Sequence, residues 1–223
     1  MKKLVILLTA LLLFACNNTQ KEAQNESASE TTYSVDRTSV KFKWIAYKTS
    51  DKIAVPGTFD NIKTEVSEGK DIPALLSSVS FTIDGTSINS GNPERDEKLR
   101  KFFVGNWTNS IITGSIESVS GDNEKGQGKF KLNWNGLSKT LDFNYTVNND
   151  TLKVISEIIM PDWNAGDAAK ALNDACKNVH TGKDGKSVLW DNVMITIKAP
   201  VKKQNSTIED LKEGTEAVKT IMK

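Results

Sequence analysis

The chain has 223 residues, with 29 basic and 28 acidic side chains and a single histidine. This near-neutral charge provides no field that would collect nucleic acid or an anionic membrane surface, so we expect no nucleic-acid partner. Histidine is the usual proton-transfer residue of acid–base catalysis and of nucleophile–base pairs, so a chain with one histidine offers few such mechanisms. The length suits one domain after a leader is removed.

The first residues predict a secretory signal over residues 1–15. Two lysines precede an apolar run over residues 4–13, and Ala15 stands directly before Cys16. A positive start, a short apolar core and a small-residue cleavage site are typical of signal peptides, and the run is well below the ~20 residues of a membrane-spanning helix. The Leu-Phe-Ala-Cys sequence that ends at Cys16 resembles the bacterial lipobox, in which the cysteine becomes the acylated first residue. The alternative is an ordinary signal peptide that happens to contain a cysteine.

Residues 16–32 predict a disordered tether between the acylated cysteine and a folded domain. The segment is rich in Asn, Gln, Ser, Thr and Glu and holds almost no side chain that could build a core. More than one acyl chain on Cys16 gives stable anchoring, whereas a single chain is marginal. Residue 17 is Asn and not Asp, which by resemblance to the lipoprotein sorting rules of enteric bacteria favours the outer membrane. We therefore expect a protein of the bacterial cell envelope, anchored in the outer membrane at its periplasmic face or its surface.

Cys176 and His180 lie four residues apart in a predicted helix and could share one face. A metal site needs more ligands than this pair, so no metal or cofactor is expected. With Cys16 acylated, Cys176 has no cysteine to pair with, and packing as a small buried hydrophobic residue is the favoured interpretation.

Alternation of apolar and polar residues with a period of two predicts about eight antiparallel strands from Tyr33 onward. Phe130, Leu132 and Trp134, for example, alternate with polar neighbours. The predicted strands cover residues 39–48, 53–66, 76–84, 111–120, 127–135, 139–147, 151–160 and 190–199. Asn- and Gly-rich turns near residues 135 and 149 separate them. Eight strands can close into a barrel that holds one small ligand, although a sandwich would show similar alternation.

Three stretches have helical character. Residues 93–103 are short and charged, with apolar residues on one side. Residues 162–180 begin with Asp162 as a predicted N-cap. Their apolar stripe comprises Ala165, Ala168, Ala169, Leu172, Cys176 and Val179. Residues 201–223 form a C-terminal tail, in which 206–223 are predicted to be an amphipathic helix or partly disordered.

The order of several short motifs resembles that of the YceI-like family, the polyisoprenoid-binding lipocalin-like β-barrels of bacteria. The matching segments are residues 36–42, 57–59, 87–89, 95–103 and 136–140, and the resemblance covers residues 33–199. The chain has Thr38 where the family often has histidine and Trp107-Thr108 where it often has Tyr-Pro. The resemblance implies an all-β antiparallel barrel over residues 33–200, with one or two helical insertions and a hydrophobic tunnel for an isoprenoid chain.

The resemblance also suggests which residues meet the ligand. The candidate lining residues are Phe42, Trp44, Phe81, Trp134, Phe143 and Tyr145. The alternative for each is that it simply fills the barrel as core, because small barrels are often packed solid. Arg95, Asp96 and Arg100 are candidates for a mouth that meets a lipid head group, and a solvated helix face explains them equally well.

These observations favour a membrane-anchored protein that binds or carries an apolar polyprenyl lipid without catalysing a reaction. The alternative is a structural or interaction module with a filled barrel, which would show no cavity and an exposed apolar patch. An enzyme ranks well behind, because only scattered carboxylates, Cys176 and His180 are available.

Overall fold

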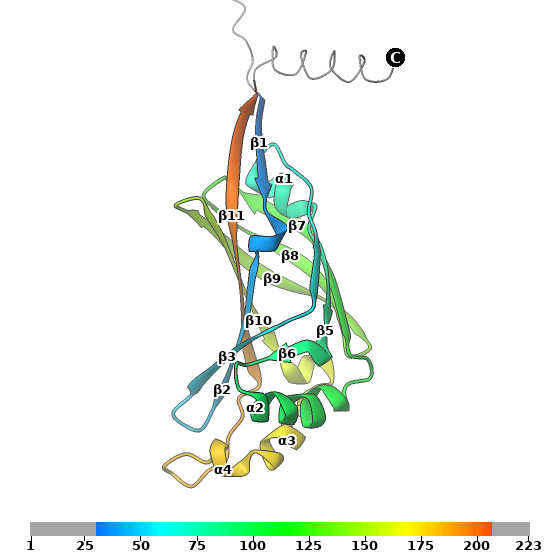
Figure 1. The fold of residues 1–223 in the computed structure, drawn as a ribbon, viewed down its shortest axis with the longest axis vertical. Helices are drawn as coiled ribbons and strands as arrows, with labels where there is room; N and C mark the ends of the chain where they lie inside the picture. Colours follow the sequence, from blue (N-terminus) through cyan, green and yellow to red (C-terminus); the bar gives the residue numbers. More distant parts are fainter. Residues whose placement is uncertain (1–29, 207–223) are drawn as a thin grey trace, which may run out of the picture.

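The computed structural model describes residues 30–206, which form one strongly curved antiparallel sheet with short helices at its ends (Figure 1). The strands are β1 (Glu30–Val35), β2 (Lys41–Lys48), β3 (Ile53–Phe59), β4 (Ile62–Glu65), β5 (Ser80–Asp84), β6 (Ile88–Asn89), β7 (Ile111–Gly121), β8 (Lys125–Trp134), β9 (Leu137–Asn148), β10 (Thr151–Ile159) and β11 (Asn192–Ser206). The helices are α1 (Ile72–Ser77), α2 (Pro93–Lys98), α3 (Gly166–Ala175) and α4 (Lys177–His180). Short turns are η1 (Arg37–Ser39), η2 (Gly85–Ser87), η3 (Leu99–Phe103), η4 (Val104–Asn106) and η5 (Met160–Trp163).

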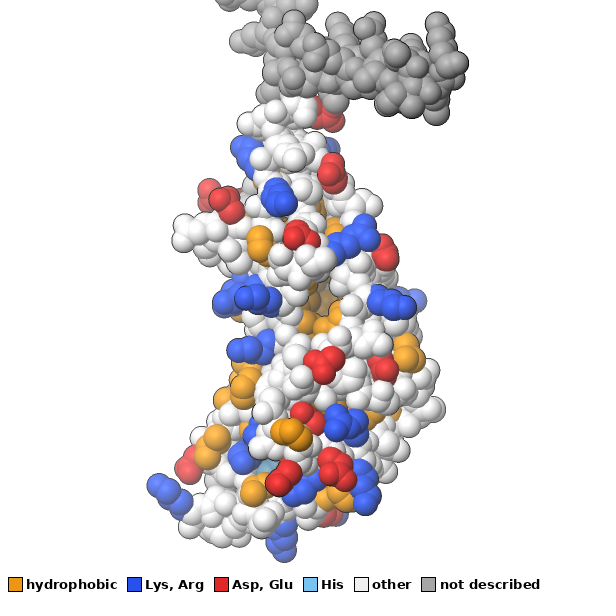
Figure 2. Space-filling model, in the orientation of Figure 1, with side chains coloured by type: hydrophobic (Ala, Val, Ile, Leu, Met, Phe, Trp, Pro, Cys, Tyr) orange, Lys and Arg blue, Asp and Glu red, His pale blue; other side chains and the backbone are white. Residues whose placement is uncertain are grey.

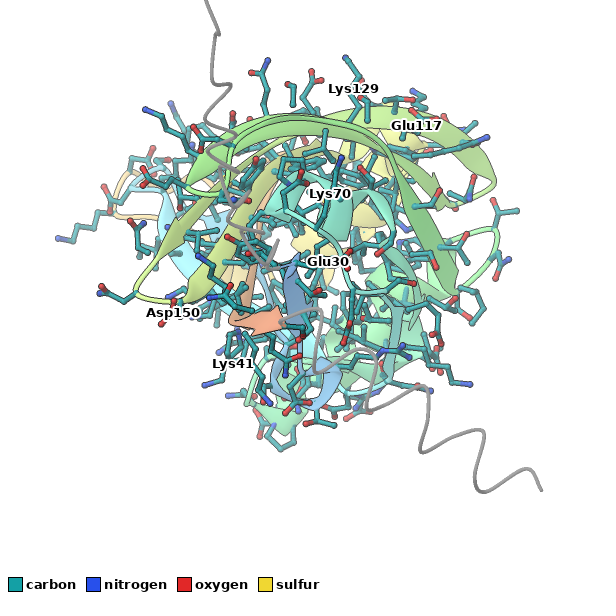
Figure 3. All side chains as sticks on the ribbon, turned by 90° about the horizontal axis from the view of Figure 1, so that it is seen from above. Glu30, Lys41, Lys70, Glu117, Lys129 and Asp150 are labelled. Atoms are coloured by element: carbon teal, nitrogen blue, oxygen red, sulfur yellow. The ribbon has the colours of Figure 1, made fainter. Side chains whose placement is uncertain are left out.

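The sheet runs in the order β4-β5-β7-β8-β9-β10-β11-β2-β3-β6, with β1 paired to the far part of β11. The curved sheet places alternate side chains inside and outside, as the period-two pattern predicts. Figure 3 looks down the long axis and shows Glu117 and Lys129 pointing away from the outer face. The all-β barrel class predicted from the sequence is confirmed, although residues 30–206 form eleven strands rather than eight.

The prediction of one strand over residues 53–66 is wrong, because the structure has two strands there, β3 and β4. β3 pairs with β2 and β6, whereas β4 pairs with β5, so the chain changes partners between them. The break is fixed by Ser87, whose backbone oxygen accepts from Asp60 N at 2.9 Å and whose Oγ accepts from Asn61 N at 3.0 Å. An alternating pattern that continues through such a break gives no sign that the hydrogen-bonding partner has changed.

Helix α1 occupies the start of the segment predicted as a strand over residues 76–84. Asp71 caps it by accepting a hydrogen bond from Ala74 N at 2.7 Å, and Pro73 lies in its first turn. The helix buries Ile72, Leu75 and Leu76 almost completely. Six residues are too few to show helical periodicity, so the sequence pattern does not reveal this helix.

The folded domain extends beyond the predicted boundaries at residues 33 and 200. Glu30 pairs with Ser206 and Val35 with Val201, so β1 and the last part of β11 form a two-stranded ribbon. The end of the predicted tether and the start of the predicted tail therefore belong to the sheet. Their polar composition hid them, because a ribbon with little core satisfies its backbone groups without apolar side chains. The signal peptide, Cys16 and the helix predicted over residues 206–223 lie outside the described residues, except that Ser206 ends β11.

Both predicted turns are confirmed. Asn135-Gly136 and Asn149-Asp150 have positive φ at both positions, as two-residue hairpin turns require. In the turn between β7 and β8, the Asp122 carboxylate accepts hydrogen bonds from the backbone amides of Lys125 and Glu124. These bonds lower the pKa of Asp122.

The lower end of the barrel, opposite the ribbon, is covered by helices (Figure 1). The segment predicted over residues 93–103 is helical, as α2 followed by η3. The predicted N-cap Asp162 is wrong: it lies inside η5, and α3 begins after Ala165 without a side-chain cap. The apolar stripe is buried except Val179, which is 48% exposed because the helix ends and restarts at Cys176. No described helix has the length and apolar character to cross a membrane.

The Asn135 side chain links three segments at the lower end of the barrel by hydrogen bonds. Its side-chain amide nitrogen donates to the backbone oxygens of Trp163 at 2.8 Å and Asn164 at 3.0 Å, and its oxygen accepts from Thr108 N at 2.6 Å. The residue is 5% exposed. One buried amide therefore joins the β8–β9 hairpin, the segment that enters β7 and the segment that leads to α3.

Cys176 and His180 are both buried where α3 meets α4. The His180 Nδ1–H donates to the side-chain oxygen of Asn173 at 2.9 Å. Burial, with smaller contributions from Lys48 and Lys98, lowers the pKa of His180 to about 4. Within the described residues, no group of three or more metal-ligating side chains gathers. The environment favours the packing interpretation of this pair.

Replacing Tyr145 with phenylalanine should lower the free energy of unfolding by about 1 kcal/mol, measured by urea denaturation. The ring is 1% exposed, and its hydroxyl donates to the Asp122 backbone oxygen at 2.7 Å, so the variant loses one hydrogen bond that joins β9 to the β7–β8 turn. Tyr47→Phe is the matched control, because the Tyr47 hydroxyl makes no hydrogen bond within the described residues. Equal stability of the Tyr145 variant and the wild type would contradict the prediction.

Stability should also fall as the pH drops from 7.5 to 5, because the unfolded chain takes up a proton on His180 before the folded chain does. With an unfolded pKa of 6.5 and a folded pKa of about 4, this loss is about 2 kcal/mol. We expect His180→Phe to remove most of the loss when unfolding is compared at the two pH values. An unchanged pH dependence in the variant would show that other groups cause it.

Candidate lipid-binding cavity

The inner face of the sheet encloses a cavity of about 230 Å³. Its wall takes side chains from every described strand, and every lining side chain is apolar except Thr64 and Ser156. The Ser156 hydroxyl donates to the Asp142 backbone oxygen at 2.7 Å and is therefore already paired. A wall of this kind suits a hydrocarbon chain and offers few fixed polar contacts.

Aromatic rings lie along the wall because glycines on neighbouring strands make room for them. Trp44 covers Gly57 and Phe81 covers Gly114, and a Cβ atom at either glycine would overlap the ring. The Trp44 indole N–H donates to the Thr58 backbone oxygen at 3.0 Å, which fixes the ring in this position. Rings held against the wall leave the centre of the barrel open, so the barrel is not filled by its own side chains.

Both ends of the cavity are closed. At the upper end, Leu75 and Leu76 of α1 line it, and Figure 3 shows Lys70, just before α1, above the middle of the barrel. At the lower end, Leu99 and Phe103 of η3 and Leu172 of α3 complete the lining. A long ligand therefore cannot enter along the barrel axis without moving a helix.

A side opening lies between β2 and β4, which do not pair with each other in the described sheet. Below the opening, the β2–β3 ladder begins where Trp44 pairs with Gly57. Above it, Tyr33 and Gly69 exchange two backbone hydrogen bonds of 2.7 and 3.0 Å. Figure 2 shows a hollow at this height, with hydrophobic side chains at its bottom and basic side chains on both sides. This hollow is the candidate entrance to the cavity.

The rim of the opening is basic. Lys41 and Lys43 project outward from β2, Lys63 projects from β4, and all three are exposed. Arg37 reaches across the upper rim to Glu65, with a 2.8 Å contact between two exposed side chains. The lysines make no ion pair within the described residues, so they can meet an anionic group at the entrance.

A cluster of aromatic rings forms the lower end of the cavity. Trp107 contacts Phe103 and Trp134 edge to face, each with ring centroids 5.2 Å apart, and Trp134 also contacts Trp163 at 6.0 Å. Trp163 is 1% exposed and supports the cluster from behind. Because Asn135 binds the Trp163 backbone oxygen, the same amide positions these rings.

Five of the six predicted lining residues lie on the cavity wall, namely Phe42, Trp44, Phe81, Trp134 and Phe143. Tyr145 does not reach the cavity. It lies on the inward side of β9 but is covered by α1, and burial raises the pKa of its hydroxyl. The tyrosine is a structural residue in this position, because its hydroxyl is committed to the Asp122 turn.

The charged residues predicted at a mouth lie elsewhere. Arg95 and Arg100 belong to the α2–η3 segment at the lower end and do not line the cavity, and Arg100 donates to the Ile88 backbone oxygen at 3.3 Å. Asp96 is buried and accepts hydrogen bonds from Ser90 N and Oγ at 2.8 and 2.6 Å. Asp96 therefore fixes the turn before α2, and the entrance lies beside other basic residues.

Several lining residues were missed by sequence reasoning. Leu75 and Leu76 belong to the short helix α1, and Trp107 and Leu189 belong to no strand. Trp107 was noted only as a departure from the family pattern at residues 107–108. Trp107 closely follows the helix predicted over residues 93–103. A bulky apolar ring at that position could have indicated a residue that closes one end of the barrel.

The fold agrees with that of BcnA of Burkholderia cenocepacia, which is 20% identical with a TM-score of 0.53. The match covers 76% of this chain and 99% of BcnA. A polyisoprenoid-binding domain from Saccharophagus degradans, implicated in plant cell wall breakdown, is 13% identical with a TM-score of 0.49, over 81% of this chain and 99% of that domain. The Campylobacter jejuni YceI protein is 20% identical with a TM-score of 0.47, over 69% and 85%.

No curated protein matches the chain. The model of the YceI-like domain matches residues 32–201, which is most of the chain and nearly all of the curved sheet with its helices. This match agrees with the resemblance noted in the sequence motifs. The protein belongs to the YceI-like family.

Proposed function

We propose that this protein binds one long apolar lipid, of the polyisoprenoid type, in its central cavity and holds it at a membrane of the bacterial envelope. The observation that carries the proposal is the apolar cavity that opens between β2 and β4. Each methylene group moved from water to such a wall contributes ~0.8 kcal/mol, so a long chain needs few polar contacts. The resemblance of the motifs to the YceI-like family favours an isoprenoid over other chains.

The cavity separates this proposal from the filled-barrel alternative. An interaction module would use Phe42, Phe81 and Trp134 to fill the barrel, whereas these rings lie around an open space. The large apolar side chains with the greatest exposure are Ile53, Ile111, Ile159 and Val179, each between 37% and 48% exposed. They lie on β3, β7, β10 and α4, and the three strands are not neighbours in the sheet, so these residues do not support a docking patch in the described part of the chain.

Binding is also favoured over catalysis by the chemistry of the wall. The described residues that line the cavity include no Asp, Glu, His, Cys, Lys, Arg or Tyr. The only reactive groups that a bound lipid would meet are the hydroxyls of Thr64 and Ser156, and the wall offers no acid or base to activate them. The buried Cys176 and His180 belong to the helix pair outside the cavity, and no cofactor forms part of the proposal.

The anchoring part of the proposal rests on the sequence. Cys16 at the end of the apolar leader is the proposed acylation site, and the chain from there to Glu30 is the tether. Acyl chains on Cys16 would keep the cavity close to a membrane, from which it can take its ligand. The outer membrane is the proposed location.

Filling the cavity should prevent lipid binding. Ala199 is 4% exposed and lines the cavity on β11, so Ala199→Phe places a ring where about three methylene groups of the ligand would lie. We expect this variant to bind a polyprenyl lipid at least ~10-fold more weakly. Thr196→Phe is the matched control, because Thr196 is on the outward side of the same strand. Native mass spectrometry of both variants, purified from membranes in mild detergent and followed by organic extraction, measures the bound lipid.

A discrete added mass in the wild type and the Thr196 control, absent in the Ala199 variant, supports the proposal. A clean protein mass in the wild type that stays unchanged after incubation with polyprenyl lipids would overturn it. The filled-barrel interaction module would then take its place.

Replacing Cys16 with serine should abolish lipid attachment and release the protein from the membrane fraction, because the thiol that carries the acyl chain is lost. Metabolic labelling with tritiated palmitate and membrane fractionation measure the effect. Cys176→Ser is the matched control and should label normally. Label in the Cys16 variant, or its loss in the Cys176 variant alone, would contradict the assignment.

A further inference from the structure

A row of lysines crosses the outer face of the sheet beside the entrance. The strand register places Lys41 of β2 directly opposite Lys198 of β11, and Lys198 directly opposite Lys153 of β10. The residues on either side of each lysine line the cavity, so the three lysines themselves point outward. Lys41 and Lys198 are exposed, and Lys153 is partly exposed.

This row is unfavourable for the isolated sheet, because like charges that face each other across neighbouring strands destabilise it. Within the described residues, none of the three lysines forms an ion pair. The positions diagonal to them hold no Asp or Glu, but Lys43, Asn144, Asn148, Thr151, Ile155, Thr196 and Pro200. The sheet therefore does not compensate this charge itself.

The opposite side of the barrel shows how another outward lysine is neutralised. Lys129 of β8 stands directly opposite Asp142 of β9, and its Nζ lies 2.8 Å from the carboxylate. Figure 3 shows Lys41 on the side of the barrel away from Lys129. The uncompensated charge is therefore a local feature of β2, β10 and β11, in a chain whose total charge is near neutral.

Apolar side chains lie next to the lysine row on the same outer face. Ile45 and Met194 face each other across β2 and β11, and Ile155 is two residues from Lys153 on β10. All three point outward and are partly exposed, and Figure 2 shows hydrophobic side chains below the basic ones beside the hollow. Lysines next to outward apolar side chains are typical of protein surfaces that lie on a membrane.

The row ends at the entrance to the cavity. Lys41 and Lys43 are on the part of β2 that has no strand partner on the side of the opening, and Lys63 stands on the other side of it. A membrane that contacts these lysines also covers the entrance, so a lipid can pass into the cavity without crossing water. A soluble polyanion would meet the same charges but would supply no lipid.

We propose that the docking face formed by Lys41, Lys43, Lys63, Lys153 and Lys198 binds an anionic phospholipid surface and turns the entrance toward it. The inference rests on the proposed function, since a protein that takes its lipid from a membrane has to present its entrance there. Each lysine near an anionic surface strengthens binding by ~5-fold. The docking face thus orients a domain that the acylated Cys16 already keeps near the membrane.

The test compares the acylated full chain in nanodiscs of phosphatidylcholine alone and in nanodiscs that also contain phosphatidylglycerol. Acetylation by acetic anhydride, followed by mass spectrometry, measures the access to each lysine. Lys41, Lys153 and Lys198 should react roughly 3-fold more slowly in the anionic discs, and high salt should remove the difference. Lys177 and Lys183, which are exposed at the lower end, are internal controls and should react equally in both discs.

A variant tests whether the charge of the row causes the protection. Lys198→Gln removes the central charge, so docking should weaken by ~5-fold and Lys41 and Lys153 should lose protection in the anionic discs. Uptake of polyprenyl lipid from anionic vesicles should slow in this variant, while uptake from neutral vesicles should stay unchanged. Lys177→Gln is the matched control, because it makes the same change of charge on α4, and it should leave protection and uptake unchanged.

The outcomes separate the docking face from the lipid-binding proposal. Equal acetylation of the row in both discs, or equal effects of the Lys198 and Lys177 variants, overturns the docking face and leaves lipid binding intact. Protection of the row in a protein that takes up no polyprenyl lipid from either kind of vesicle overturns the proposed function instead.

Discussion

The lower half of the molecule depends on the three hydrogen bonds of the Asn135 side chain. Asn135 occupies a left-handed position in a tight hairpin turn, where asparagine is one of the few residues that fit without strain. From that position its amide reaches two other segments that are distant in sequence. A buried amide with three partners is satisfied in full only in one geometry, so it fixes the relative placement of Trp107, Trp134 and Trp163.

The distribution of polar groups explains why the barrel can be hollow. The strands satisfy their own backbone, the outer face carries the charge, and the inner face is left with apolar side chains alone. Trp44 and Phe81 lie against glycines of adjacent strands rather than across the barrel. The space that remains results from placing these rings along the wall, where they contact the backbone of the neighbouring strand.

Much of the fold was predictable because antiparallel strands with one buried face leave a direct record in the sequence. Phe130, Leu132 and Trp134 of β8 were predicted to face inward, and the Asn-Gly and Asn-Asp turns gave the hairpins around β9. Features that depend on tertiary contacts left no such record. The partner change between β3 and β4 is set by Ser87, and the ribbon of β1 with β11 has a composition that resembles a linker.

The candidate site was predictable to a similar extent. Five of six predicted wall residues lie on the cavity, since an aromatic side chain on the inner face of a curved sheet points toward the barrel interior. Tyr145 was misplaced because alternation does not reveal that α1 covers its part of the strand. The basic entrance was missed for the opposite reason: alternation places Lys41 and Lys43 correctly outside, but only the unpaired edges of β2 and β4 show that an opening lies beside them.

The ribbon of β1 and β11 determines how the domain is presented to its surroundings. Glu30 and Ser206 are partners in the ladder, so the described chain enters and leaves the domain at one pole (Figure 1). Six residue pairs form a stalk of about 20 Å that is stiffer than a single extended strand. Anything joined to either end is held on the side of the ribbon, and the opposite pole, with α2, α3 and α4, remains free to turn toward another surface.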